Sequence, residues 1–335
     1  MGSLRQSEID KSRPVSVRTR VMKPARTTLS FLSLAALAIS SCLGTDAAAQ
    51  SLVSAGNIQT FPAGTWPESL AFDGTNIWVS DMLGGTLTKL RASDGTLQGT
   101  FVVGSNPTWL AFDGANIWVT MILNDDRVWK VRASDGAILG TFPMSTHPQG
   151  LAWDGENMWV ALENQETVAK LRDSDGTVLG LYDSGDRPSG LLFDGANIWT
   201  ADEYSGIVTK LRASDGVLLG TFSVGGGTTA NRLAFDGKKI WVSVSDINTV
   251  VALRASDGKI QGSFAVGGFP SGLAFDGANI WTTNEFDNNV TKLRAKTGVI
   301  TRTIPVGNYP SDVLYDGHSI WVANALSNTV SKISP

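Results

Sequence analysis

Hydrophobic and polar positions along the chain follow a pattern that repeats seven times, about every 40 residues. A typical copy has an apolar run such as Leu-Ala-Phe, then Asp-Gly, Asn-Ile-Trp-Val and a polar loop. In most copies Lys-Leu-Arg, a Ser-Asp-Gly turn and a last apolar run follow. The repeated Asp is Asp73, Asp113, Asp154, Asp194, Asp236, Asp276 and Asp316, and the repeated Trp is Trp78, Trp118, Trp159, Trp199, Trp241, Trp281 and Trp321. Such a period indicates one supersecondary unit stacked on copies of itself.

The second copy shows how one unit is expected to fold. Residues 110–112, 116–120, 128–132 and 138–142 are apolar or β-branched runs separated by turn residues. Asp-Gly between such runs predicts a tight hairpin, because Gly adopts a positive φ at little cost. Each copy is therefore predicted to be a four-stranded antiparallel meander, with strands A to D. One such sheet exposes two apolar faces, and seven sheets placed radially cover each other in a β-propeller.

Repeated aromatic residues are expected to fill the gaps between the blades. Besides the Trp of strand B, they are the strand A residues Phe72, Phe112, Trp153, Phe193, Phe235, Phe275 and Tyr315. The seventh copy has no strand D, whereas residues 60–64 match the strand D phrase of residues 100–104. We therefore predict an all-β, seven-bladed β-propeller over residues 50–335, closed by an N-terminal strand that completes the last blade.

Residues 1–49 differ from the repeats and are predicted to direct export. An apolar run over residues 31–39 follows Lys23 and Arg26, and Ala47-Ala48-Ala49 resembles a cleavage site. The run is too short for a transmembrane helix. The stretch before Met22 is long for a signal, so Met22 is an alternative start of translation.

Cys42, the only cysteine, leaves two outcomes of export open. Cleavage near Ala49 would remove it, whereas Ile39-Ser40-Ser41-Cys42 resembles a bacterial lipobox, in which the Cys is lipidated. The expected location is periplasmic, extracellular or lipid-anchored at the cell envelope, with membrane contact only through lipidation of Cys42. In either case the folded part has no cysteine and no disulfide to stabilise it.

The charge of the chain bears on its partners. The formal net charge is −4, and residues 1–49 carry seven of the 27 basic and three of the 31 acidic side chains, so the rest carries −8. An acidic protein is a poor candidate for nucleic-acid binding, and we expect none.

The phrases Phe-Asp-Gly-Ala-Asn-Ile-Trp-Val and Lys-Leu-Arg-Ala-Ser-Asp-Gly resemble those of bacterial seven-bladed β-propellers of the YVTN and NHL type. That broad group includes the streptogramin lyases. The resemblance covers the whole chain after the export segment. It implies the architecture and leaves the activity open, because the group contains binding modules, scaffolds and enzymes.

The copies diverge in the loops between strands D and A and between strands B and C, which a meander places on one face around the central channel. Ligand sites favour such variable loops. Residues before or just after the start of strand A form the candidate ligand site: Trp66, Glu68, Trp109, His147, Arg187, Arg232, Phe269, Tyr309 and Asp312. The aromatic rings could stack on a sugar or a planar group, and the charged groups could bind polar groups. The alternative is that these positions drifted under weak constraint.

Catalysis has less support in the sequence. The two histidines, His147 and His318, are expected on opposite faces, and the chain has no Gly-x-Ser-x-Gly motif. The resemblance to streptogramin lyases would imply a cluster of His and Glu around a divalent metal, and only His147 lies on the channel face. An enzyme would instead use Ca²⁺ or Mg²⁺ held by carboxylates at the ends of the B strands: Asp81, Glu163, Asp202, Glu203 and Glu285.

Two functions follow from the sequence. The leading hypothesis is an exported, monomeric, non-catalytic binding or scaffold module without a cofactor, whose ligand is a protein or a glycan at the channel mouth. The alternative is a metal-dependent lyase or a lactonase-like hydrolase.

Overall fold

The computed structural model describes residues 58–123, 125–145, 147–225 and 228–335. They belong to the second of the two units into which the chain divides, Ser51–Pro335. The predicted export segment, residues 1–49 with Met22 and Cys42, lies outside the described residues. None of the helices among the described residues has the length and apolarity needed to cross a membrane.

The described unit consists of seven four-stranded antiparallel sheets, numbered here as blades 1 to 7. Blade 1 contains β2 (Pro67–Phe72), β3 (Asn76–Asp81), β4 (Thr86–Arg91) and β5 (Leu97–Val102), and blade 2 contains β6 (Pro107–Phe112), β7 (Asn116–Met121), β8 (Arg127–Arg132) and β9 (Ile138–Pro143). Blade 3 contains β10 (Pro148–Trp153), β11 (Asn157–Leu162), β12 (Thr167–Arg172) and β13 (Val178–Asp183), and blade 4 contains β14 (Pro188–Phe193), β15 (Asn197–Asp202), β16 (Ile207–Arg212) and β17 (Leu218–Ser223).

The remaining blades follow the same order. Blade 5 contains β18 (Ala230–Phe235), β19 (Lys239–Val244), β20 (Thr249–Arg254) and β21 (Ile260–Ala265), and blade 6 contains β22 (Pro270–Phe275), β23 (Asn279–Asn284), β24 (Asn289–Arg294) and β25 (Ile300–Pro305). Blade 7 contains β26 (Pro310–Tyr315), β27 (Ile320–Asn324), β28 (Thr329–Ile333) and β1 (Ile58–Pro62). Three 3₁₀ turns, η1 (Glu163–Gln165), η2 (Ser245–Ile247) and η3 (Ala325–Ser327), connect strands B and C in blades 3, 5 and 7.

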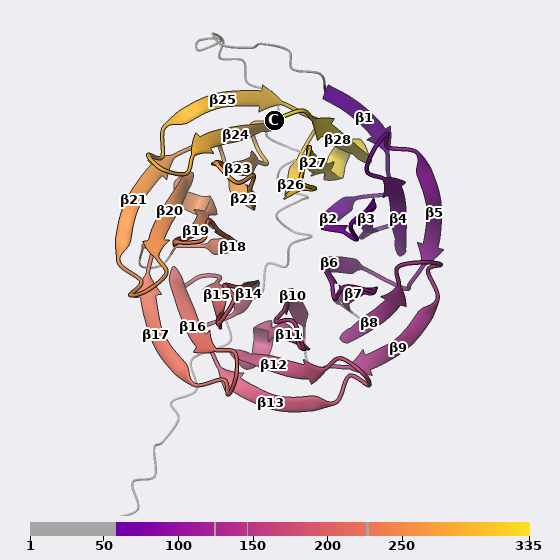
Figure 1. Ribbon diagram of the computed structural model, residues 1–335, viewed down its shortest axis with the longest axis horizontal. Coiled ribbons are helices and arrows are strands. Elements are labelled where there is room, and N and C mark those ends of the chain that lie inside the picture. The colour runs from indigo at the N-terminus through magenta and orange to yellow at the C-terminus, as the bar shows by residue number, and fades with distance from the viewer. Residues whose placement is uncertain (1–57, 124, 146, 226–227) are drawn as a thin grey trace, which may run out of the picture. The chain divides into compact units, whose positions relative to one another are not determined.

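The blades form a closed ring around a central axis, with strand A of each blade innermost (Figure 1). We call the region around this axis, between the A strands, the channel. Closure depends on β1, which pairs antiparallel with β28 from Ile58↔Ile333 to Pro62↔Thr329. The predicted fold is confirmed, including completion of the last blade by the N-terminal strand. A closed ring leaves no blade with an uncovered apolar face, which is the physical reason for seven copies to assemble in this way.

The core lies between the blades. Each of seven apolar clusters joins residues of two neighbouring blades, and the Trp of every strand B is fully buried. Burial of such a side chain contributes roughly 1.5–3 kcal/mol. The strand A aromatics are only half-buried at the edges of these clusters. Strand D supplies a second ring that the repeat pattern did not predict, as where Phe101 lies 5.3 Å from Trp78.

The Asp-Gly turn, the Trp and the Lys of each copy act as one structural unit. In blade 1, Asp73 accepts hydrogen bonds from the indole N–H of Trp78 at 2.8 Å and from the amide N–H of Asn76 at 2.6 Å. The ammonium of Lys89 lies 5.0 Å from the Trp78 ring centroid and donates to the carbonyl of Ala133 in blade 2 at 2.6 Å. The repeated lysines of strand C therefore join neighbouring blades.

The strand connections lie on two opposite faces of the ring. The A–B and C–D turns form one face, here called the turn face, where the N–H of Ala92 donates to the carbonyl of Thr75. The B–C and D–A loops form the other, here called the loop face, where the N–H of Met82 donates to the carbonyl of Trp66. His147 lies on the loop face and His318 on the turn face, as expected from the sequence.

Candidate functional site

The loop face carries bulky side chains on a backbone conformation that favours glycine. In six blades the residue before strand A has a φ between 42° and 61°, and these residues are Trp66, Asn106, His147, Arg187, Phe269 and Tyr309. A non-glycine residue in the left-handed region costs on the order of 1–3 kcal/mol and persists only where the surroundings hold it. The turn face instead places Gly at its positive-φ turns. The loop face therefore keeps large side chains where Gly would be cheaper.

Neighbouring blades hold this conformation in place. The amide N–H of Trp66 donates to Oδ1 of Asn328, and that of Tyr309 donates to Oδ1 of Asn288, both at 2.9 Å. Each Asn belongs to the B–C loop of the preceding blade, and Asn288 and Asn328 also have positive φ. Hydrogen bonds between neighbouring blades therefore connect these loops, and they fix the backbone from which the side chains at the channel mouth extend.

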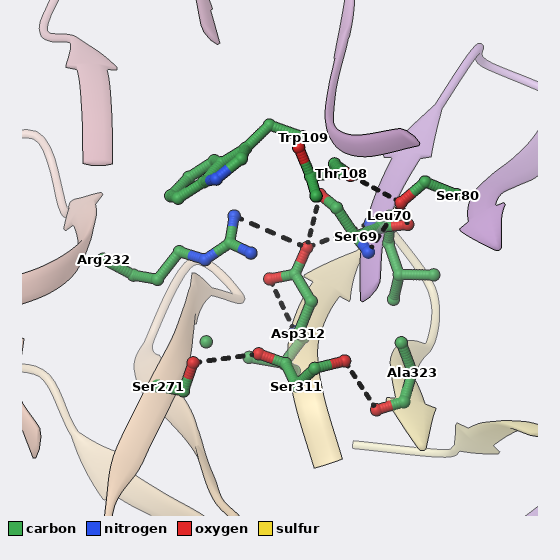
Figure 2. Close-up of polar contacts among 12 residues, drawn as sticks. Ser69, Leu70, Ser80, Thr108, Trp109, Arg232, Ser271, Ser311, Asp312 and Ala323 are labelled. Atoms are coloured by element: carbon green, nitrogen blue, oxygen red, sulfur yellow. Dashed lines mark hydrogen bonds and ion pairs between the residues drawn. The ribbon is translucent and has the colours of Figure 1, made fainter. Parts of the chain in front are cut away.

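An inward-facing cation crosses the channel from blade 5. Arg232 on β18 lies with its guanidinium carbon 3.4 Å from the ring centroid of Trp109 on β6, and its Nη1 is 3.9 Å from Oδ2 of Asp312 on β26 (Figure 2). Asp312 also accepts hydrogen bonds from the Ser69 hydroxyl and the Leu70 amide, each at 3.0 Å. These residues come from blades 1, 2, 5 and 7, so one contact network spans the channel. We call it the arginine bridge.

A second network joins blades 3 and 4. Glu163, almost fully buried at 1% exposure, accepts a hydrogen bond from the Gln149 amide at 2.9 Å, and its Oε2 is 2.9 Å from Nδ1 of His147. Its other oxygen pairs with Arg187, whose guanidinium lies 4.6 Å from the Tyr204 ring. Burial lowers the pKa of His147, the Arg187 charge lowers it further and the Asp126 charge opposes them. We call this group the histidine cluster.

The third group, here called the acid–aromatic cluster, lies between blades 6, 7 and 1. The indole N–H of Trp66 donates to Oε2 of Glu68 at 3.1 Å, and the rings of Trp66 and Tyr309 are 5.7 Å apart. Burial raises the pKa of Glu285 to about 8, and the nearby Glu68 carboxylate adds to the effect, while the hydroxyls of Tyr309 and Ser271 and the Arg232 charge oppose it. Burial likewise raises the pKa of Glu68, against the Arg232 charge.

A row of rings extends this cluster across the loop face. Phe269 lies 4.8 Å from Phe286, which lies 6.5 Å from Tyr309. Phe286 is 52% exposed, so the row is open to solvent. Neither Phe286 nor Tyr204 was selected from the sequence. Both directly follow a Glu just after strand B, in Glu285-Phe286 and Glu203-Tyr204. This Glu-aromatic pair, present in two copies, is the sequence feature that could have identified them.

The structure distributes the predicted ligand residues among these three groups. Trp66, Glu68 and Tyr309 meet in the acid–aromatic cluster, and Phe269 reaches it through Phe286. The arginine bridge contains Trp109, Arg232 and Asp312, and the histidine cluster contains His147 and Arg187. The Trp109 indole donates to Gln149 at 3.1 Å and so connects the last two groups.

The carboxylates named for a metal are not gathered at one point. Asp81 accepts from the Gly64 amide, in the loop before β2, and from the hydroxyls of Thr86 and Thr88 on β4. Asp202 accepts from the hydroxyls of Thr200 on β15 and Thr209 on β16, so both carboxylates are engaged in contacts within the fold. Glu163 belongs to the histidine cluster and Glu285 to the acid–aromatic cluster. Burial raises the pKa of Glu203 to about 7 against the Arg187 charge. Within the described ranges, no three His, Cys, Asp or Glu side chains are grouped as metal ligands would be.

The fold and the loop-face networks define a seven-bladed β-propeller with a polar and aromatic channel mouth. No family model and no curated protein matches the sequence. Among solved structures, a streptogramin B lyase superposes with a TM-score of 0.70 at 17% identity, over 83% of this chain and 97% of that one. Virginiamycin B lyase from Staphylococcus aureus gives 0.71 at 18% identity, over 83% and 99%. The hydrazine synthase of Kuenenia stuttgartiensis gives 0.71 at 18%, over 85% and 99%.

These likenesses agree with the family resemblance read from the repeats. The chain has the fold of a seven-bladed β-propeller of the streptogramin lyase type. At 17% and 18% identity they define the fold, and function has to be argued from the site.

Proposed function

We propose that this protein is a binding module that holds a protein or glycan ligand on its loop face, at the channel mouth. The observation that carries the proposal is the set of bulky residues at left-handed positions. Trp66, Phe269 and Tyr309 occupy a conformation that costs free energy and that Gly would relieve. Retention of rings there is explained by a use for the rings, and exposed aromatic side chains are the common anchors of ligands.

The test compares matched substitutions at one backbone position. Glycan and peptide arrays would be probed with the purified protein and with its Trp66→Gly and Tyr309→Gly variants. Glycine removes the ring without forcing Ala into a positive φ. Asn106→Gly is the control, because Asn106 has the same conformation in blade 2 and carries no ring. We expect both ring variants to lose the bound ligands and the control to keep them. Equal binding by all four proteins would refute a loop-face site.

A metal-dependent lyase or lactonase is the second candidate. It is favoured by Glu163, Glu203 and Glu285, which follow strand B at the same position in three blades and are all buried at the loop face. The fold likeness to a virginiamycin B lyase supplies a first substrate to assay. Turnover of virginiamycin B that requires Mg²⁺ or Ca²⁺, stops with chelator and is lost in Glu203→Gln and Glu285→Gln would establish the enzyme. A folded protein without metal-dependent turnover of this substrate would leave the binding module as the better account.

We also propose that the protein works outside the cytoplasm as a monomer. The support is the apolar run over residues 31–39 followed by small residues and Cys42. Cell fractionation of the full chain and of Cys42→Ser tests this. If the full chain and Cys42→Ser are both exported and both recovered free of membrane, cleavage near Ala49 is indicated. If only Cys42→Ser is recovered free of membrane, lipidation of Cys42 is indicated. Retention of both in the cytoplasm would contradict export, and light scattering of the purified protein gives its oligomeric state.

A further inference from the structure

The acid–aromatic cluster has the environment of a cation site without a cation of its own. At the loop face, the arginine bridge sets Arg232 between a ring and a carboxylate, Trp109 and Asp312. The histidine cluster repeats this arrangement, with Arg187 between Tyr204 and Glu163. A cation over a ring face beside a carboxylate is stabilised by both the ring quadrupole and the opposite charge. The fold therefore uses one kind of cation environment twice.

The acid–aromatic cluster offers the same partners in greater number. It contains two carboxylates, Glu68 and Glu285, beside the ring pair of Trp66 and Tyr309. Across the described part of the chain, no Lys or Arg nitrogen lies within 4.0 Å of either carboxylate. Arg232 is the nearby charge, and it is engaged with Asp312 and Trp109.

One carboxylate oxygen in this cluster is also unsatisfied. Glu285 is only 6% exposed, and its Oε2 has no hydrogen-bond partner. Its carboxyl faces Glu68, Tyr309, Ser271 and Arg232, which places it on the channel side of the loop face. A buried acceptor without a partner costs about 1–3 kcal/mol, and a donor arriving with a ligand removes that cost. Trp66, Glu68 and Tyr309 are all partly exposed, so the cluster can be reached from solvent.

We infer that the loop face recognises an organic cation, an alkylammonium or guanidinium group, which donates to Glu285 and Glu68 and lies against the rings of Trp66 and Tyr309. This inference rests on the proposed binding function and names the chemical group that the ligand presents. A metal ion fits less well, because Ca²⁺ takes six to eight oxygen ligands and rings supply none. The next carboxylate, that of Asp312, is engaged with Arg232, Ser69 and Leu70. Among the described residues no three His, Cys, Asp or Glu side chains are grouped as metal ligands would be.

The recognised group has two sources in the proposed ligands. A protein presents it as a lysine or arginine side chain, and a glycan presents it as an amino sugar. Both provide a hydrogen-bond donor with a positive charge, so the shared chemistry is tested first. Each probe is a cation with a neutral partner. The pairs are n-butylammonium and n-butanol, Nα-acetyl-lysine methylamide (with a free side-chain ammonium) and Nα-acetyl-norleucine methylamide, and glucosamine and glucose.

Calorimetric titration of the purified protein with each pair gives the result. We expect n-butylammonium to bind with a Kd of about 1 mM or tighter, at least about tenfold below that of n-butanol. Above pH 8, where Glu285 is ionised, Glu285→Gln and Glu68→Gln should each weaken it about tenfold or more, because each then removes one negative charge from the site. Glu156→Gln is the control, since it removes the same charge from an exposed position on the turn face. The lysine and glucosamine pairs then show which source is preferred.

The pH dependence supplies a readout that a general charge effect would not give. Binding of a cation should strengthen from pH 6 to pH 8, because Glu285, with its pKa raised to about 8, has to release its proton. The n-butylammonium ion, which is used for this series, stays protonated over this range, as a Lys side chain does. Thermal unfolding of each variant, recorded first, shows that it is folded.

These experiments distinguish failure of the cation site from failure of the proposed binding function. Preference for the charged member of a pair, lost in both Gln variants and kept in Glu156→Gln, supports the cation site. Binding of neutral glycans or peptides that depends on Trp66 but shows no preference for charge overturns the cation site and leaves the binding module intact. Stabilisation by Ca²⁺ alone that depends on Glu285 overturns it in favour of a metal. Absence of any loop-face ligand overturns both.

Discussion

The two faces of the ring are built from the same seven repeats, yet they differ in what varies. On the turn face, every blade has an Asp that accepts from the buried Trp, at 2.7–2.9 Å. On the loop face, the backbone conformation recurs while the side chain changes from Trp to His, Arg or Tyr. The turn face therefore repeats one structural unit in every blade, whereas the loop face keeps a backbone conformation and varies its side chains, as the proposed ligand site requires.

Blade 5 shows how strongly the turn-face unit is maintained. Its strand C has Ala252 where the other blades have Lys, and Ala252 pairs with Trp241 as Lys89 pairs with Trp78. Lys239 of strand B takes over, with its ammonium 4.8 Å from the Trp241 ring and 2.5 Å from the Ala295 carbonyl of the next blade. A cation in this position matters more than the strand that supplies it.

The largest expected difference is between the buried Trp of a turn-face unit and a Trp on the loop face. Trp118→Ala should lower the free energy of unfolding by about 3–5 kcal/mol, because it opens a cavity between two blades. Trp66→Gly removes a partly exposed ring and relieves a positive φ, so it should change that free energy by less than about 1 kcal/mol. Denaturant unfolding followed by circular dichroism measures both. Equal losses would mean that the loop face is also structural.

A smaller effect is expected from the turn-face carboxylates. Burial alone would raise the pKa of Asp113, but hydrogen bonds from Asn116, the Trp118 indole and backbone amides lower it to about 2. Its stabilising contribution is complete above the unfolded value near 3.8 and is lost as the pH falls toward 2. Asp113→Asn should therefore cost about 2 kcal/mol at pH 7 and almost nothing at pH 2. A cost that stays constant with pH would contradict this assignment.

The role of Lys239 in blade 5 can be tested by transferring the lysine from strand B to the strand C position that it occupies in the other blades. Lys239→Asn should cost about 1–2 kcal/mol, since it removes a cation over Trp241 and a donor to the next blade. Adding Ala252→Lys restores the arrangement of the other blades and should recover most of that loss. A double variant no more stable than Lys239→Asn would show that the two positions are not equivalent. Thermal unfolding of the three proteins provides the comparison.

An effect of the opposite sign is expected on the loop face. Because its pKa is raised, Glu285 binds a proton more tightly in the folded state, so stability falls as pH rises from about 4.5 to about 8. Glu285→Gln should match the native protein at pH 4 and exceed it by about 1 kcal/mol or more at pH 9. Unfolding at both values checks this. A variant less stable at pH 9 would show that the charged carboxylate is satisfied within the fold.

The candidate site could be predicted only in part. The divergence of the loops selected Trp66, Glu68 and Tyr309, and in the structure the Trp66 side chain contacts both of the others. The residues selected just after the start of strand A do not all occupy the same position of the strand. Glu68 is one residue beyond Pro67, whereas Trp109 is two residues beyond Pro107. A register shift follows the start of every strand A, as between Pro67 and Leu70, and this bulge breaks the alternation of faces that sequence reasoning assumes.

The number of blades, the hairpins and the buried Trp of each strand B could be predicted from the sequence, because they depend on a local pattern repeated at a fixed period. The strand that closes the ring could be predicted as well, since β1 carries the strand D phrase that the last copy lacks. The contacts of Arg232 with Trp109 and Asp312, and the proximity of Glu285 to Glu68, became visible in the folded ring alone. Those contacts join blades far apart in sequence across the channel, and their geometry is set by closure of the ring rather than by any local pattern.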